Sequence, residues 1–243
     1  MRIVSLCPST TESLVALGLA GSLAGVTRYC VHPREALEGI PRVGGTKNPD
    51  LAAIAALEPD LVLCNAEENR EPDVSELARR HRVDVSHPTR VADVPPLLRR
   101  LGALTGAEAA AEGWARAIEE RLASVRPRRP VRFACLIWKG PWMAAAEGTY
   151  LSSLLETFGG VNVFPPEAGP WPRTGEEAVA ALAPDLVVLP DEPFPFGEAD
   201  RAAWAGLLPR ARVELVPGDD FCWHGVRTLR GLDAAGTLLA EAA

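Results

Sequence analysis

The sequence predicts an α/β protein of two similar Rossmann-like lobes, each with a parallel sheet, joined by a long rigid α-helix. The segment PDLV occurs at 59–62 and again at 184–187, within two stretches, 51–69 and 176–194, whose sequences resemble each other. Such repetition indicates two copies of one structural unit. Between the copies, residues 93–125 are rich in Ala, Leu, Glu and Arg, with apolar residues three and four apart, which predicts helix. The expected parts are an N-terminal lobe over 1–92, a connecting helix over 93–125 and a C-terminal lobe over 126–243.

Short apolar strands, each followed by a polar loop, support this architecture. Strands that are apolar throughout suit a parallel sheet covered on both faces. The expected strands are RIVSL (2–6), a segment near LAGVTRY, DLVLC (60–64), RFACLIW (132–138), DLVVLP (185–190) and VELVP (213–217). After the first strand, Ser9 and Glu12 have the spacing of a helix capping box.

The segment 93–125 is expected to be a stiff strut that holds the two lobes at a nearly fixed separation. Thr105-Gly106 is the point at which it could be interrupted, because glycine commonly ends a helix.

Composition narrows the class of protein and the partners. The net charge is -7 and no dense block of Lys and Arg occurs, so no nucleic-acid partner is expected. No apolar run is long enough to span a bilayer, and no membrane insertion is expected. The five cysteines include no CxxC pair, which predicts mostly free thiols. The opening MRIVSLCPS has no basic or apolar leader region, which predicts a cytoplasmic protein, or a periplasmic or cell-surface protein if an upstream signal was omitted. A monomer is expected.

The candidate binding site lies in the loops that follow the strands. Ligands of open parallel sheets bind beyond the carboxyl ends of the strands. Four of the six tryptophans lie in such loops of the second lobe; one alone would indicate core packing, but four together favour an aromatic small-molecule pocket. The candidate ligand contacts are Tyr29, Cys30, His32, Lys47, Asn65, Glu67, Asn69, Trp138, Trp142, Trp171, Arg173, Glu192, Phe194, Trp223 and His224.

A metal site is a weaker alternative. Cys30 and His32 form one Cys-x-His pair, and Cys222 and His224 form another. Residues two apart on an extended chain point the same way, so two pairs that face one cleft could supply four zinc ligands. Structural zinc sites usually have CxxC pairs, which argues against this reading.

Catalysis has little support in the sequence. GxSxG, HExxH, P-loop and GxGxxG motifs are all absent, so no catalytic residue and no required cofactor are expected. His81 and His87 lie in helix-end and strand-end text and are interpreted as structural or solvated.

Several stretches together resemble the iron-siderophore and vitamin B12 substrate-binding proteins of ABC importers. They are RIVSLCPSTTESLVALGLAGSLAGVTRYCVHP, NPDLAAIAALEPDLVL, GEEAVAALAPDLVVL and FCWHGVRTLRGLDAAGTLL. The text is most similar to the cobalamin-binding branch of this class III periplasmic-binding-protein-like family. GGTKNPD and EENR resemble a subgroup labelled helical backbone metal receptor.

The resemblance implies two lobes with a ligand cleft between them and non-covalent binding of a corrinoid or a metal chelate, without turnover. By matching position, the cleft would be lined by Tyr29, residues 65–69, Trp138, Trp142, Phe194, Trp223 and His224. Alternatives are a ferric-chelate or direct metal-ion receptor, and a tetrapyrrole- or metal-handling enzyme of chelatase-like fold with His224 or His32 in its site.

The resemblance also implies an ABC-importer permease as partner. Family members dock on it with one surface Glu per lobe, and Glu177 fits this pattern in the second lobe. The equivalent first-lobe position is Ala52, and Asp50, two residues away, is the candidate substitute.

Overall fold

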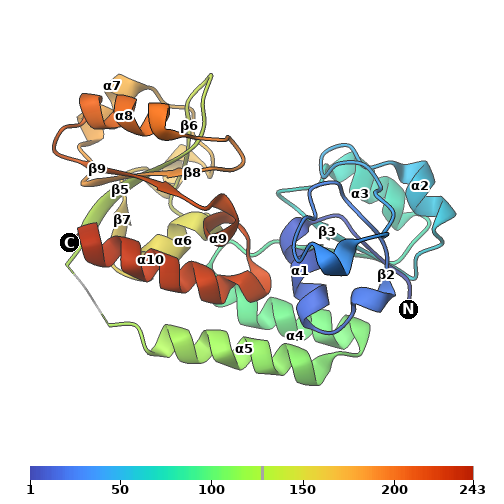
Figure 1. Ribbon diagram of the computed structural model, residues 1–243. Helices are drawn as coiled ribbons and strands as arrows, with labels where there is room; N and C mark the ends of the chain where they lie inside the picture. The colour runs from blue at the N-terminus through green and yellow to red at the C-terminus, as the bar shows by residue number, and fades with distance from the viewer. Residues whose placement is uncertain (127–128, 243) are drawn as a thin grey trace. The chain divides into compact units, whose positions relative to one another are not determined.

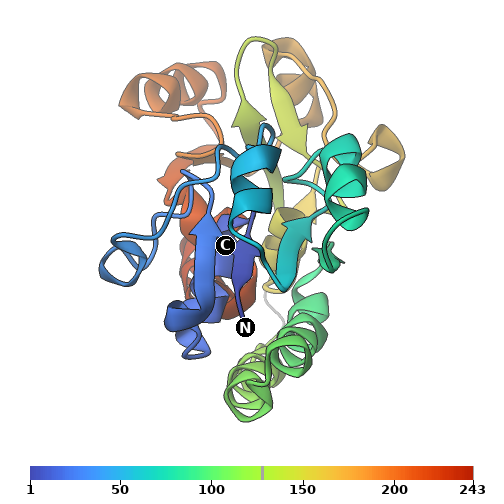
Figure 2. The same cartoon turned by 90° about the vertical axis from the view of Figure 1, so that its right-hand side faces the viewer.

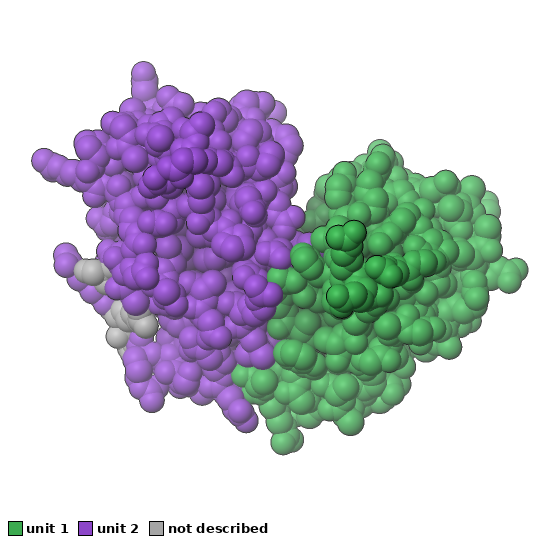
Figure 3. Space-filling view, in the orientation of Figure 1, with its two compact units in different colours: residues 1–88, 93–117, 224–227 green, residues 89–92, 118–223, 228–243 purple. Residues whose placement is uncertain are grey.

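The computed structural model describes residues 1–126 and 129–242. The chain divides into two compact α/β units, shown in different colours in Figure 3. Unit 1 comprises residues 1–88, 93–117 and 224–227, and unit 2 comprises 89–92, 118–223 and 228–243. The units differ from the expected parts in three ways. The expected connecting helix is divided between them at residue 117, residues 89–92 belong to unit 2, and residues 224–227, late in the chain, belong to unit 1. Residues 127, 128 and 243 of the expected C-terminal lobe lie outside the described residues.

Unit 1 is built on a parallel four-stranded sheet with the order β2-β1-β3-β4. Its strands are β1 (Ile3–Ser5), β2 (Leu23–Val26), β3 (Leu61–Asn65) and β4 (Val83–Ser86). Its helices and 3₁₀ turns are α1 (Pro8–Ala16), η1 (Ala20–Ser22), η2 (Glu35–Leu37), α2 (Leu51–Ala56), α3 (Glu71–Ala78), α4 (Val94–Thr105), the first part of α5 (Glu108–Ala123) and η5 (Gly225–Arg227). Ile3 and Val4 are neighbours in β1 but belong to two different apolar clusters, so both faces of the sheet are covered as the unbroken apolar pattern predicted.

Unit 2 has a mixed sheet with the order β6-β5-β8-β9, and β7 also pairs with β5. Its strands are β5 (Val131–Trp138), β6 (Met143–Ala145), β7 (Gly160–Asn162), β8 (Leu186–Pro190) and β9 (Arg212–Val216). Its remaining helices and 3₁₀ turns are η3 (Val91–Asp93), α6 (Tyr150–Glu156), η4 (Pro166–Ala168), α7 (Glu176–Leu182), α8 (Glu198–Leu207), α9 (Gly218–Cys222) and α10 (Thr228–Ala242). Helices α7 and α8 cover one face of the sheet and α6 and α10 the other (Figure 1). β6 runs antiparallel to β5, a hairpin that the sequence did not predict.

The internal repeat has the same structural role in both units. Asp60 accepts a hydrogen bond from the Arg2 amide at 2.7 Å, and Asp185 accepts one from the Arg132 amide at 3.0 Å. Each aspartate therefore joins the start of its own strand to the start of the neighbouring strand. The Arg2 side chain donates to the Leu57 carbonyl at the end of α2, the helix before β3. The Arg132 side chain donates to the Leu182 carbonyl at the end of α7, the helix before β8.

The segment expected to be one long helix is two helices. Gly106 adopts a left-handed φ of 74° and ends α4, at the interruption point considered in the sequence. The two helices then lie side by side (Figure 1, Figure 2). A Cβ on Gly102 would lie 2.6 Å from the Ala111 side chain, so the glycine permits this close approach. Within the described residues, no helix combines the length and the apolar character needed to cross a membrane.

Residues 224–227 join unit 1 by packing on α1. The Val226 amide donates to Ser13 Oγ at 3.2 Å, and Gly225 has a φ of 84° with no room for a Cβ, which would lie 2.1 Å from the same oxygen. Arg227 forms a two-bond ion pair with Glu12, at 2.7 and 2.6 Å, and the arginine side chain is only 4% exposed. The capping box expected from Ser9 and Glu12 is therefore wrong, because α1 begins after Cys7 with no side-chain cap and Glu12 is used by Arg227.

His224 is buried in the same region of unit 1. Its Nε2 lies 3.2 Å from Ser9 Oγ and 3.3 Å from Asn65 Nδ2. Burial lowers the pKa of the imidazole to about 4, because the charged form would lose its hydration. The ring is therefore neutral at pH 7.

We expect Arg227→Met to lower the free energy of unfolding by about 3 kcal/mol, because it leaves the Glu12 carboxylate without its buried counter-ion. Urea unfolding would measure the loss. The double variant Glu12→Leu/Arg227→Met should recover part of it, and Arg79→Ala, which breaks an exposed ion pair, should change stability by less than about 0.5 kcal/mol. Equal losses of stability in Arg227→Met and Arg79→Ala would contradict a stabilising role for the Arg227–Glu12 ion pair.

We expect His224 to make the protein acid-sensitive. Its folded pKa lies below its ordinary value of 6.5, so the unfolded chain binds more protons between pH 6.5 and about 4, and stability falls as the pH falls through this window. The loss amounts to about 3 kcal/mol. Urea titrations of wild type and His224→Gln across this range should diverge by that amount. Parallel stability curves would show that His224 titrates normally.

Candidate functional site

The four parallel strands of unit 1 end at one edge of its sheet. The loop with Tyr29 and Cys30 follows β2, Cys7 lies after β1, Glu67 follows β3 and His87 follows β4. The order of the strands brings residues from distant parts of the sequence to this edge. It is the edge at which parallel sheets bind ligands.

Two buried asparagines hold the loop after β3. Asn65 Oδ1 accepts from the amides of Glu67 at 2.9 Å and Glu68 at 3.1 Å, which makes a tight turn. Asn69 Oδ1 accepts from the Asn65 amide, while its Nδ2 donates to the carbonyls of Leu6 and Thr46. The polar atoms of both side chains are thus used inside unit 1, so their evident role is to position Glu67. Their role as ligand contacts stays a prediction.

Glu67 presents its carboxylate at this edge. Its side chain is 32% exposed, and Oε1 lies 3.9 Å from Nε2 of His87. Burial raises the pKa of Glu67 above its ordinary value, and the charges of His87 and Lys47 act in the opposite direction. Lys47 donates to the main-chain carbonyl of Glu67. Glu67 and Lys47 were both candidate ligand contacts in the sequence, whereas His87 was interpreted as structural or solvated.

Tyr29 is the exposed aromatic residue of this edge, with 53% of its surface accessible. The Arg28 guanidinium lies 5.6 Å from the centre of its ring, and Gly45 gives the ring room, since a Cβ there would lie 3.2 Å from it. Cys30, next in sequence, is buried, and its thiol is within hydrogen-bonding distance of Thr11 and Thr27. Burial raises the pKa of this thiol, which therefore stays protonated at neutral pH.

In unit 2, three of the aromatic candidates, Trp138, Trp142 and Phe194, belong to one packed cluster. Trp138, at the end of β5, is 41% exposed and packs edge-on against Phe194, with the two ring centres 5.6 Å apart. Trp142 is partly buried and packs against the apolar core of the unit, with its ring centre 5.9 Å from that of Phe196 (stacked) and 5.1 Å from that of Trp204. Trp142 therefore has a packing role, while Trp138 as a ligand contact stays a prediction.

The remaining candidates of unit 2 lie in separate loops. Glu192 follows β8 and packs closely against Gly218, at which a Cβ would lie 2.3 Å from the glutamate side chain. Arg173 is exposed, and its main chain forms an isolated antiparallel β-bridge with Met143 of β6. Trp171 is half-buried and Trp223 is 8% exposed.

The Cys2His2 alternative finds little support within each unit. Over residues 1–126 and 129–242, no group of three or more His, Cys, Asp or Glu side chains is placed to hold a metal ion. Cys30, His32 and His224 belong to unit 1 and Cys222 to unit 2, where its thiol lies 3.6 Å from the Glu192 carbonyl.

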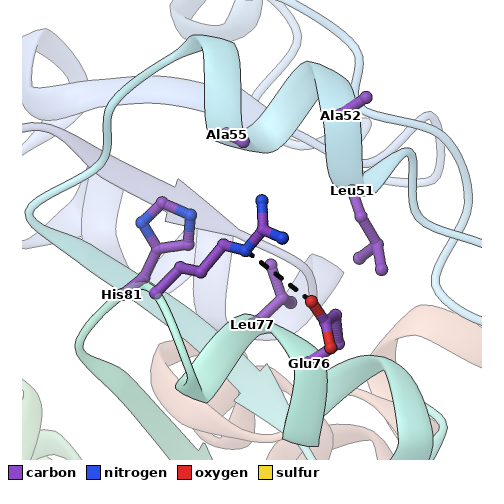
Figure 4. Close-up of a pocket in the computed structure, with 7 residues that line it drawn as sticks. Leu51, Ala52, Ala55, Glu76, Leu77 and His81 are labelled. Carbon is purple, nitrogen blue, oxygen red and sulfur yellow. Dashed lines mark ion pairs between the residues drawn. The ribbon is translucent and has the colours of Figure 1, made fainter.

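A shallow groove of about 230 Å³ lies between α2 and α3, apart from the strand-end residues (Figure 4). It is lined by Leu51, Ala52, Ala55, Glu76, Leu77, Arg80 and His81. Asp50, the candidate docking residue of the first lobe, caps α2 by accepting from the Ala53 amide at 2.9 Å. Glu177 is exposed in the first turn of α7, with no comparable capping bond.

The two strand-end edges offer different chemistry. Unit 1 supplies a carboxylate, an imidazole and an exposed phenol ring, and unit 2 supplies an exposed indole. The Ser9 hydroxyl lies 3.2 Å from the neutral imidazole of His224, but Ser9 is only 4% exposed. The buried thiols of Cys7 and Cys64 have pKa values raised to about 11 and about 12. Each edge, taken by itself, offers groups suited to contact with a large, partly apolar molecule.

Comparison with known proteins places the chain among binding proteins. The family described as periplasmic binding protein matches residues 3–201. A vitamin B12-binding protein of Vibrio cholerae serotype O1 is 26% identical over 96% of this chain and 86% of its own.

Solved structures agree with the fold. The periplasmic vitamin B12 binding protein BtuF of Vibrio cholerae superposes with a TM-score of 0.86 over 99% of this chain and 97% of its own, at 24% identity. A periplasmic heme binding protein from Pseudomonas aeruginosa superposes with a TM-score of 0.81 over 98% and 91%, at 26% identity. The match to the family model spans well over half of the sequence, and this chain therefore belongs to the periplasmic binding protein family.

Proposed function

We propose that this protein binds cobalamin or a related corrinoid as the substrate-binding component of an ABC importer. The likeness to the vitamin B12-binding protein of Vibrio cholerae, which extends over 96% of the chain, carries the proposal. Exposed rings at the strand ends, Tyr29 and Trp138, suit the flat and partly apolar face of a corrin ring.

The charges at the strand ends favour a ligand that bears amides over one that bears several carboxylates. Lys47 is bonded to the Glu67 carbonyl, Lys139 is paired with Asp200, and Arg28 lies over Tyr29. Binding a polyanionic ferric chelate would require these cations to leave their present partners. The amide groups around a corrin ring require only hydrogen bonds, which Glu67 and the loop main chain can supply.

Membership of the family decides three expectations from the sequence: catalysis, cofactor and location. The protein is a binding protein and not an enzyme, and the family carries a bound ligand and no cofactor. The cytoplasmic location expected from the opening residues is wrong, because the family is one of periplasmic proteins and the Vibrio cholerae relative is described as periplasmic.

We expect cobalamin to bind with a measurable heat and to raise the melting temperature. Trp138→Ala should weaken binding about tenfold through loss of a stacking surface, while Trp138→Tyr should keep most of the affinity. Isothermal titration calorimetry of the two variants against cobalamin measures the difference. If heme or a ferric siderophore binds and cobalamin does not, the receptor alternative replaces the corrinoid proposal.

Docking on an importer permease is the second part of the proposal. Glu177 is exposed, whereas the Asp50 carboxylate is already used by the first turn of α2. The first-lobe counterpart of Glu177 is Ala52, which lines the groove between α2 and α3. Unit 1 would then dock through this mostly apolar groove, in which the Arg80 side chain is paired with Glu76, and without a carboxylate at the position that matches Glu177.

We expect Glu177→Gln to weaken binding to the cognate permease at least about tenfold, because it removes a charged contact. Asp50→Asn keeps a capping side chain and should leave docking unchanged. Binding to the purified importer in nanodiscs, followed by biolayer interferometry, separates the two. A large loss with Asp50→Asn alone would assign docking in unit 1 to Asp50 instead of the groove.

A further inference from the structure

His87 lies at the strand-end edge of unit 1, although from the sequence it was interpreted as structural or solvated. It follows β4 directly, and Ser86 pairs in register with Asn65 at the end of β3. The Ala66 amide donates to the Ser86 carbonyl at 2.9 Å, so the loops after these strands leave the sheet together. The imidazole is thereby tied to the edge at which ligands of parallel sheets bind.

The carboxylate of Glu67 faces this imidazole. The Glu67 side chain is 32% exposed and that of His87 is 55% exposed, and Oε1 of Glu67 lies 3.9 Å from Nε2 of His87. The Glu67 main chain is held by Asn65 and Lys47, so the carboxylate is presented from a fixed turn. A carboxylate 3.9 Å from Nε2 attracts an N–H there and so favours the tautomer that leaves the lone pair on Nδ1. The His87 side chain is half exposed and is therefore accessible to a ligand.

The other three histidines are placed differently. His224 is buried against Ser9 and Asn65, and His81 lines the groove between α2 and α3. His32 lies in the loop after β2 and is half-buried. His87 therefore combines exposure, the strand-end edge and a facing carboxylate.

We propose that His87, oriented by Glu67, is an axial ligand of the metal ion at the centre of the bound macrocycle. The inference rests on the proposed function, because a corrinoid carries cobalt at its centre. Imidazole nitrogen is a favourable ligand for cobalt and iron. The nitrogen donates its lone pair to the metal, and the water molecule that held the axial position leaves. No electron is transferred, and the metal keeps its oxidation state.

A pair of corrinoids that differ only in their axial groups tests this bond. Diaquacobinamide has exchangeable axial waters, whereas cyanide blocks both axial positions of dicyanocobinamide. Wild-type protein should bind the diaqua form at least about tenfold more tightly and shift its visible absorption on binding. His87→Ala should bind both forms with equal affinity and without the spectral shift. Glu67→Gln should keep the shift but weaken binding of the diaqua form about tenfold.

His81→Ala is the matched control, and it should behave as wild type in both titrations. Equal affinity of wild type for the two cobinamides would overturn the proposal. A spectral shift that survives in His87→Ala and disappears in His32→Ala would overturn it in favour of His32.

Failure of the proposed function gives a different result. If neither cobinamide binds, the corrinoid assignment fails, and ferric heme becomes the probe for His87. A heme spectrum that depends on His87 would then support the axial role with another macrocycle, and one that is unchanged in His87→Ala would overturn it.

Discussion

The strand-end edge of unit 1 depends on the side-chain amide of Asn69. This one group accepts from the Asn65 amide and donates to the carbonyls of Leu6 and Thr46. It therefore joins the loops that follow β1, β2 and β3. Because it is 4% exposed, water competes little for these bonds. Loss of the amide would leave buried main-chain groups unpaired in three loops together, which makes the geometry of the site inseparable from the packing beneath it.

The two copies of the repeat share a framework but differ at their functional ends. Asp60 and Asp185 make the same bond to the neighbouring strand. At the strand ends, unit 1 is polar, with a carboxylate and an imidazole, whereas unit 2 has a cluster of aromatic rings that continues into its core. The framework depends on main-chain geometry and tolerates little change. The loops carry the chemistry and have diverged.

Much of this framework could be predicted from the sequence, because it follows from local patterns. The strands at 61–65 and 186–190 are unbroken apolar runs, and the repeated Pro-Asp text marks both. The connecting segment was predicted as helix for the same reason. Its division at Gly106 depends on how closely α4 and α5 approach, which is a tertiary property.

The parts of the site that the sequence missed depend on contacts between distant residues. Ser9 and Glu12 have capping-box spacing, but their side chains meet His224 and Arg227, more than 200 residues away. His87 is 20 residues from Glu67, and only the pairing of β3 with β4 brings them together. Their one local signal was position, since each follows a parallel strand directly.

The passage of residues 224–227 into unit 1 has a consequence for biosynthesis. A growing chain has made Glu12, Ser13 and the whole sheet of unit 1 long before it makes Gly225 and Arg227. Until then, the Glu12 carboxylate and the hydroxyl groups of α1 have no partner from this segment. Unit 1 therefore acquires its full set of contacts only after residues 224–227 have been translated.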